Sequence, residues 1–202
     1  MPAKIRRMRL LALLLVLFAD ENLAHADAAF KVGVVTRDFI PAEPYDWRGA
    51  QTHSLRVTIW YPAAAEAREE AQWVGPPVVK FFSTGSAAPG AASASGPRRP
   101  LILLSHGAGG TALGFAWLGT ALAAHGFIAA AVNHPGNNGL EALTVEGFSL
   151  WWLRATDLSA LIDAMLGDKT FGALIDPARI GAAGHSAGGY TVIAVAGDWQ
   201  NA

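Results

Sequence analysis

Apolar residues in the first third of the chain recur with the period expected of β-strands. Residues 32–35 form a short β-branched run that predicts a first strand. Between residues 54 and 61 the apolar and polar positions alternate with a period of two, which predicts a strand with one buried face. Pro62 is expected to end this strand. The side chains expected on its buried face are Leu55, Val57, Ile59 and Tyr61, with Trp60 on the other face.

The alternation of apolar and polar residues is lost between residues 63 and 100. The last part of this segment, residues 83–100, consists mostly of Ala, Ser, Gly and Pro, which offer little large apolar surface for packing. We therefore predict a low-complexity surface loop over about 63–100. Within it, a short strand is expected at residues 78–82.

Strand and helix signals alternate after Pro100. Apolar runs bounded by turn residues predict buried strands, whereas apolar residues at helical spacing predict amphipathic helices. Such alternation predicts a mostly parallel sheet with right-handed crossovers, which is an α/β fold. Asp176-Pro177 predicts a turn before the last strand. The expected strands are 101–104, 127–132 and 180–183, and the expected helices are 115–125, 151–165 and 187 onwards.

The N-terminal residues indicate an export signal. A cationic start precedes an unbroken apolar run at residues 10–19, and Ala24-His25-Ala26 supplies the small-x-small pattern that signal peptidase accepts. The run is about half of the roughly 20 residues that a membrane span needs. We predict a signal peptide at residues 1–26 and a secreted or periplasmic domain at residues 27–202 without a stable membrane span. An uncleaved anchor or a buried helix is the alternative interpretation.

Composition excludes several classes of function. The 202 residues are 52% hydrophobic and 15% charged, so the chain is expected to fold around a core. A formal net charge of -1 provides no basic field for nucleic acid. Because the chain has no Cys, it cannot form disulfides, zinc–thiolate sites or a thiol nucleophile.

The strongest motif is Gly184-His185-Ser186-Ala187-Gly188, placed between a predicted strand and a predicted helix. In that position, G-x-S-x-G is a nucleophile elbow, in which a strained turn holds the serine hydroxyl above the sheet edge. Gly184 and Gly188 avoid collisions where strand and helix approach. The alternative interpretation is a glycine-rich turn with an idle serine.

A second motif, His106-Gly107-Ala108-Gly109-Gly110, directly follows a predicted strand. Such a glycine-rich loop can aim backbone N–H groups at the oxyanion of a tetrahedral intermediate. His106 is expected to order this loop through hydrogen bonds. An ordinary flexible turn is the alternative for this motif alone.

Together these motifs resemble the α/β-hydrolase superfamily, and in particular its dienelactone-hydrolase-like and platelet-activating-factor-acetylhydrolase-like branch. The resemblance extends from about residue 30 to the end. It implies an α/β-hydrolase fold, with Ser186 as the nucleophile and the N–H groups of Ala108 and Ala187 as the oxyanion hole. The segments that carry it are 57–62, 101–110, 133–136, 176–180 and 184–189.

The chain departs from that superfamily after the elbow. The superfamily's acid and histidine follow the nucleophile along the chain, but the residues after Ser186 contain Asp198 and no His. We therefore expect a fold truncated after the nucleophile helix, with an open sheet edge. Among the remaining histidines, His134 is the least implausible substitute base, because it follows a strand at the same sheet edge as Ser186.

These observations predict a serine hydrolase of carboxylic esters that acts through an acyl-enzyme on a small-molecule or lipid ester. Without its base, the chain is expected to be slow or inactive. The alternatives are a non-catalytic remnant of a hydrolase and an acyltransferase that uses the same elbow. No cofactor is implied, and the sequence does not indicate an oligomeric state.

Other candidate residues rank lower. Phe148, Trp151 and Trp152 could line an acyl pocket, although core packing is the preferred interpretation. Asp157 and Asp163 lie on the predicted helix and are interpreted as solvated or partner-paired charges. No spacing of His, Asp and Glu predicts a metal site.

Overall fold

The computed structural model describes residues 30–43, 45–75 and 79–197. The predicted signal peptide at residues 1–26 lies outside the described residues and stays a prediction. The strands are β1 (Lys31–Phe39), β2 (Leu55–Ala63), β3 (Glu70–Val74), β4 (Phe82–Pro89), β5 (Arg99–Ser105), β6 (Ile128–Asn133) and β7 (Ile175–Gly184). The helices are α1 (Ala116–Ala124), α2 (Val145–Ser149), α3 (Leu153–Gly167) and α4 (Ala187–Ala196), with 3₁₀ turns η2 (Ala112–Phe115) and η3 (Gly172–Leu174).

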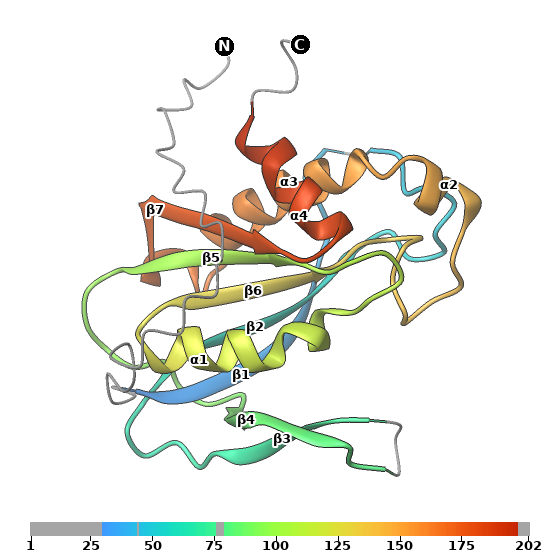
Figure 1. Ribbon diagram of the computed structural model, residues 1–202. Helices are drawn as coiled ribbons and strands as arrows, with labels where there is room; N and C mark the ends of the chain where they lie inside the picture. The colour runs from blue at the N-terminus through green and yellow to red at the C-terminus, as the bar shows by residue number, and fades with distance from the viewer. Residues whose placement is uncertain (1–29, 44, 76–78, 198–202) are drawn as a thin grey trace, which may run out of the picture.

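The strands form one sheet in the order β3-β4-β1-β2-β6-β5-β7 (Figure 1). β5, β6 and β7 are parallel, and they end side by side where the predicted motifs lie. The pairs β1–β2, β2–β6 and β3–β4 are antiparallel. The sheet is therefore mixed, and its parallel part carries the candidate site.

Helices cover the two faces of the sheet and create two apolar cores. α3 and α4 pack over one face, where Leu158, Leu161 and Met165 meet Leu101 and Leu103. The other face lies under α1. This two-sided burial explains why the strands after Pro100 are almost continuously apolar. The second core includes Trp60, Leu104, Ala116, Ala123, Ala129 and Ala131.

Strand β2 differs from the expected one-sided strand. It runs through Pro62 to Ala63, and only Arg56 within it is exposed. Trp60 is fully buried beneath α1, because Gly119 lets the helix approach. A Cβ on Gly119 would lie 2.4 Å from a ring atom of Trp60.

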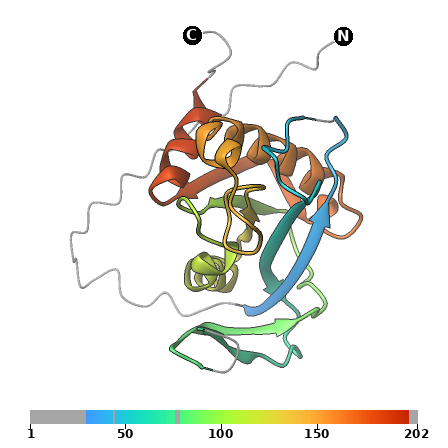
Figure 2. The same ribbon diagram turned by 90° about the vertical axis from the view of Figure 1, so that its right-hand side faces the viewer.

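The prediction of a loop throughout residues 63–100 is wrong. β3 and β4 form an antiparallel hairpin there, and β4 also pairs with β1 in parallel. The hairpin lies at the end of the molecule away from α4 (Figure 1 and Figure 2). Most of its side chains are exposed, so the sequence carries little apolar periodicity. The short strand expected at 78–82 is also misplaced, because β4 begins at Phe82.

The other predicted elements occur close to their expected positions. The strand expected at 180–183 begins earlier, at Ile175, and the expected turn at Asp176-Pro177 is part of β7. The pairing with β5 is irregular at this point, between Arg99 and Leu101. α1 ends before Gly126, which adopts φ +92°.

Candidate active site

The turn between β7 and α4 has the geometry expected of a nucleophile elbow. Ser186 adopts φ 54° and ψ -123° there, a conformation that costs a non-glycine residue about 1–3 kcal/mol. A Cβ on Gly184 would lie 2.2 Å from the carbonyl oxygen of Gly188. One on Gly188 would lie 1.8 Å from the carbonyl oxygen of Ser105. Both positions therefore require glycine, because β5, β7 and α4 meet through their backbones.

Ser186 is exposed, and it precedes the first turn of α4. Its hydroxyl makes no hydrogen bond to the part of the chain that the structure describes. The N-terminus of a helix favours nearby negative charge. The hydroxyl is thus accessible, and charge developing beside it would be stabilised.

The two N–H groups predicted to form the oxyanion hole are both unpaired. Among residues 30–197 as described, neither the Ala108 nor the Ala187 N–H has a hydrogen-bond acceptor. Gly107 places the first of these groups beside the elbow. A Cβ on Gly107 would lie 3.4 Å from the Cβ of Ser186. The geometry is therefore compatible with two donors near one reacting carbonyl oxygen.

His106 fixes the loop that carries Ala108. Its Nδ1–H donates to the carbonyl oxygen of Gly107 at 2.6 Å, and its Nε2 accepts the backbone N–H of His134 at 3.2 Å. Only a neutral ring can make both bonds. Burial lowers the pKa of His106 to about 4, which keeps the ring neutral near pH 7. The Gly110 N–H also donates to the Gly107 oxygen, at 3.1 Å.

Asparagine side chains at the end of β6 and in the loop after it hold the loop that carries Ala108 through hydrogen bonds. Asn137 Oδ1 accepts the Gly109 N–H at 2.8 Å, and Asn133 Oδ1 accepts the Ala112 N–H at 2.9 Å. Both asparagines are buried. The loops at the ends of β5 and β6 are thus joined, which limits movement of the Ala108 N–H.

A buried ionic cluster lies beneath these loops. Asp157 on α3 accepts hydrogen bonds from Arg48 at 2.9 Å, from Tyr45 at 3.0 Å and from the Nδ1–H of His134 at 2.6 Å. Arg48, His134, Arg154 and Asp157 are all fully buried. Burial raises the pKa of the Asp157 carboxyl, and Arg48 opposes that shift. The three donor groups mark Asp157 as an ionised acceptor.

Sequence reasoning assigned no role to most of this cluster. For this helix, helical spacing in the sequence predicts an apolar face made of Trp151, Ala155, Leu158, Ile162 and Met165. The buried face instead holds Arg154, Asp157, Leu158, Leu161 and Met165. One sequence signal was available for the cluster. Arg154 and Asp157 are three residues apart, so they share a helix face with the apolar residues that follow. Asp157 is partner-paired and Asp163 is exposed, in line with the two interpretations offered.

His134 does not serve as a base for Ser186. Its ring is fully buried, with Nδ1 bonded to Asp157 and Nε2 bonded to the Ser105 hydroxyl at 2.8 Å. Burial lowers the pKa of His134 well below its usual value. The ring therefore joins Ser105 to Asp157 and has no nitrogen left for the elbow. His185, the histidine within the elbow, is exposed beside Gly107.

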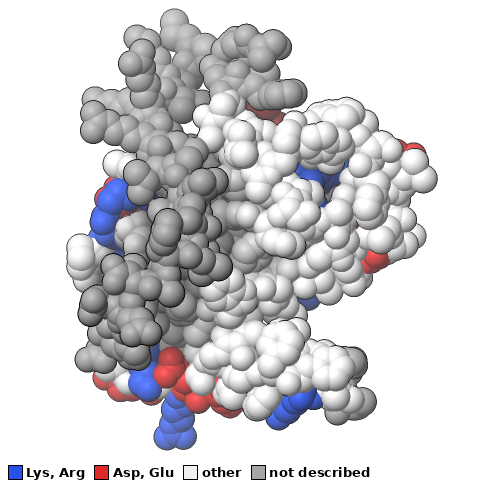
Figure 3. Space-filling model, in the orientation of Figure 1, with Lys and Arg blue, Asp and Glu red and all other residues white. Residues whose placement is uncertain are grey.

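The three aromatic residues expected in the core lie at the surface. Phe148 is 47% exposed, Trp151 38% and Trp152 46%, because they occupy α2 and the turn before α3. Trp151 packs on Tyr190, one turn beyond Ser186, with ring centroids 3.8 Å apart. The face formed by α2, α3 and α4 carries few charged side chains (Figure 3). Core packing is therefore the wrong interpretation, and an apolar surface borders the elbow.

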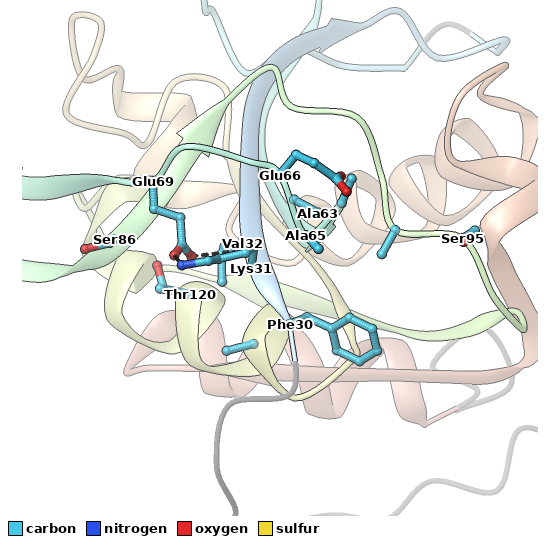
Figure 4. A pocket seen from close by; sticks show the side chains of 13 residues that line it. Phe30, Lys31, Val32, Ala63, Ala65, Glu66, Glu69, Ser86, Ser95 and Thr120 are labelled. Atoms are coloured by element: carbon cyan, nitrogen blue, oxygen red, sulfur yellow. Dashed lines mark hydrogen bonds and ion pairs between the residues drawn. The ribbon is translucent and has the colours of Figure 1, made fainter.

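A cavity of about 770 Å³ lies at the other end of the sheet. Its lining includes Phe30 and Ala63, and Glu69 accepts a hydrogen bond from Lys31 there at 2.8 Å (Figure 4). These residues flank the start of β1 and the end of β2, opposite the end where Ser186 lies.

Across the described ranges there is no group of His, Asp and Glu suited to a metal ion. No described helix combines the length and apolarity needed to cross a bilayer.

Comparison with known proteins agrees with this architecture. Residues 82–145 match the family model of platelet-activating factor acetylhydrolase, isoform II. Among solved structures, the ferulic acid esterase from Streptomyces cinnamoneus is similar, with a TM-score of 0.67 and 28% sequence identity. The match covers 85% of this chain and 57% of that protein. Comparison with curated proteins gave no significant match.

Proposed function

We propose that this chain is a serine hydrolase of carboxylic esters, because residues 82–145 match the acetylhydrolase family model and the fold is similar to that of an esterase. The observation that carries this proposal is the elbow: an exposed Ser186 on a strained turn, near two N–H groups that have no acceptor among the described residues. The similarity to an esterase supports the same reaction class.

In the proposed reaction, the Ser186 hydroxyl attacks the ester carbonyl and loses its proton to a base. The Ala108 and Ala187 N–H groups stabilise the resulting oxyanion, the alcohol leaves, and water then hydrolyses the acyl-enzyme. The described residues supply the nucleophile and the oxyanion donors but no base in contact with Ser186. We therefore expect this chain alone to hydrolyse esters slowly. Enzymes that lack triad members keep roughly 10³–10⁴-fold acceleration over water.

The substrate that fits this surface is an ester with an apolar group. Trp151 and Tyr190 present tilted rings in contact beside the elbow, and Leu143 lies 4.0 Å from a Cβ built on Gly109 of the oxyanion loop. An apolar acyl or aryl group would lie on these side chains while its carbonyl reached Ser186. We propose a small-molecule or lipid ester of this kind.

No described residue offers a base in contact with Ser186, and this favours a second candidate, a non-catalytic hydrolase remnant that binds such ligands. The two candidates differ in whether Ser186 reacts. An activated serine is phosphonylated by a fluorophosphonate probe, with loss of fluoride, whereas a remnant leaves the probe intact.

Treatment of the purified chain with a fluorophosphonate tests the proposal. We expect labelling that disappears in Ser186→Ala and persists in Ser159→Ala, which removes an exposed hydroxyl on α3. Slow hydrolysis of p-nitrophenyl acetate should be lost in parallel. Absence of labelling in the wild type would support the remnant instead.

We also propose that the protein is exported, on the basis of its N-terminal sequence. N-terminal sequencing of the protein recovered from producing cells should begin at Asp27 in the periplasm or medium. A chain that retained residues 1–26 would contradict this proposal.

A further inference from the structure

Arg154 lies between the two halves of the candidate oxyanion hole. It projects from α3, is fully buried and contacts the residues that end β5. One of its NH2 hydrogen bonds goes to the carbonyl oxygen of His106, and a longer one goes to the Ser105 hydroxyl at 3.4 Å. The Nε–H donates to the Thr191 hydroxyl on α4 at 3.2 Å. A single guanidinium thus joins α3, β5 and α4.

On one side, Arg154 acts on the loop that carries Ala108. It holds the carbonyl oxygen of His106, while the ring of His106 holds the carbonyl oxygen of Gly107. Two successive peptide groups are therefore fixed. Because the C=O and N–H of a trans peptide point in opposite directions, holding the Gly107 oxygen sets the direction of the Ala108 N–H.

On the other side, Arg154 acts on the first turn of α4. Thr191 accepts from Arg154 and donates its own hydroxyl hydrogen to the carbonyl oxygen of Ala187 at 2.9 Å. Ala187 supplies the second proposed oxyanion donor. Arg154 therefore reaches each donor through one intermediate residue, His106 or Thr191.

The buried chain Asp157–His134–Ser105 orients the guanidinium. His134 donates from Nδ1 to Asp157, so its Nε2 accepts the Ser105 hydroxyl hydrogen. The Ser105 oxygen is then free to accept from Arg154. Asp157, three residues along α3, supplies the compensating negative charge.

Stability alone does not explain this arrangement. Among the described residues, Arg154 NH1 and two nitrogens of Arg48 are buried without a hydrogen-bond partner. Each unpaired buried donor costs about 1–3 kcal/mol. Apolar residues often replace buried ion pairs without loss of stability.

We propose that Arg154 is a positioning residue that fixes the Ala108 and Ala187 N–H groups relative to Ser186. This inference rests on the proposed ester-hydrolase function, because it assigns those N–H groups to an oxyanion hole. Thr191 connects Arg154 to Ala187, and the Asp157–His134–Ser105 chain holds the guanidinium in place.

Four variants of the full chain test the proposal. Arg154→Lys keeps the positive charge but removes the planar guanidinium with its several N–H donors. Thr191→Val removes the hydroxyl acceptor on α4. Thr191→Ser restores a hydroxyl. Met165→Ala removes a buried side chain from the distant end of α3 and serves as the control for lost stability. Two quantities are measured: the second-order rate of fluorophosphonate labelling, and the ¹H–¹⁵N amide shifts of Ala108 and Ala187.

We expect Arg154→Lys and Thr191→Val to slow labelling about tenfold to hundredfold, since small misplacements of catalytic groups have effects of that size. The amide shifts of Ala187 in both variants, and of Ala108 in Arg154→Lys, should move. Thr191→Ser and Met165→Ala should label within about twofold of the wild type, even where Met165→Ala unfolds at lower urea.

The outcomes separate this proposal from the proposed function. Wild-type labelling rates in both Arg154→Lys and Thr191→Val would overturn the positioning role, as would equal slowing by Met165→Ala. If the wild type does not label but the two amide shifts still move, the positioning role holds and the hydrolase proposal fails. If the wild type does not label and neither amide shift moves in the variants, both the hydrolase proposal and the positioning role are wrong.

Discussion

Two serines lie at neighbouring strand ends and differ in almost every respect. Ser105 ends β5 and is paired in register with Gly184, two residues before Ser186. Ser105 is fully buried and bonded to His134, which is bonded to Asp157. Ser186 is exposed, strained and without a side-chain partner in the described part of the chain. Ser105 thus has the hydrogen bonds of a catalytic triad, whereas Ser186 has the access and backbone geometry.

The difference shows that a Ser–His–Asp chain of hydrogen bonds is not sufficient for nucleophilic catalysis. A nucleophile must reach a substrate, and Ser105 cannot, because α3 and α4 cover it. The buried chain instead serves to hold the loops that surround Ser186. Four changes test how far the two regions differ.

The largest effect is expected from Asp157→Asn, which removes the charge at the centre of the buried region. It leaves Arg48 and Arg154 buried without a counter-ion, and removing one partner of a buried pair costs about 3–5 kcal/mol. Urea unfolding measures this loss. Asp163→Asn, on the exposed side of the same helix, should stay within about 0.5 kcal/mol of the wild type. A similarly small effect of Asp157→Asn would contradict the assignment of an ionised Asp157.

Next in size is the effect of Gly188→Ala, which places a methyl group 1.8 Å from the Ser105 carbonyl oxygen. Backbone must shift, so we expect a loss of about 3 kcal/mol and a large drop in Ser186 labelling. Gly189→Ala is the matched control. Its Cβ would lie 3.6 Å from the nearest atom, and alanine favours the helix. Equal behaviour of the two variants would show that the elbow is not closely packed.

The buried region should also respond to acid. The folded protein holds His106 neutral down to about pH 4, whereas the unfolded chain protonates it near pH 6.5. The unfolded state therefore binds more protons in this window, and stability falls as the pH falls. His106 alone should remove about 2 kcal/mol between pH 6.5 and 4.5, and His134 acts in the same direction.

Urea unfolding across this pH range, compared between the wild type and His106→Gln, isolates the His106 contribution. The comparison is needed because burial raises the pKa of Asp157, which opposes the trend. Averaged over this range, the slope should be about 1 kcal/mol per pH unit smaller in the variant. Identical slopes would mean that His106 is protonated in the folded protein.

The smallest effect is expected on the exposed side of the elbow. Trp151→Ala removes the ring that packs on Tyr190, which should cost about 1 kcal/mol. Trp152→Ala is the control, because this ring is 46% exposed and stacks on no described aromatic residue. Unfolding midpoints of the two variants give the difference. A larger loss in Trp152→Ala would reverse the roles assigned to these neighbours.

The elbow, its oxyanion loop and the strands beside them could be predicted from the sequence. Their signals are local: glycines at fixed spacing around Ser186, and apolar runs that end at Ser105 and Gly184. The backbone distances at Gly184 and Gly188 supply the steric reason for that spacing.

The hairpin β3–β4 and the buried cluster could not be predicted in the same way. The hairpin is an exposed edge, so its strands lack the apolar alternation that identifies strands such as β2. The cluster joins Arg48, His134 and Asp157 across as many as 109 positions of sequence. No local pattern specifies such a contact, and charged residues on a helix are usually exposed.

Peptide mapping by mass spectrometry after fluorophosphonate labelling compares the two serines most directly. The wild-type chain should carry the phosphonyl group on Ser186 only, with the peptide that contains Ser105 unmodified. Modification of Ser105, or none at Ser186 after prolonged treatment, would contradict the assignment of Ser186 as the nucleophile.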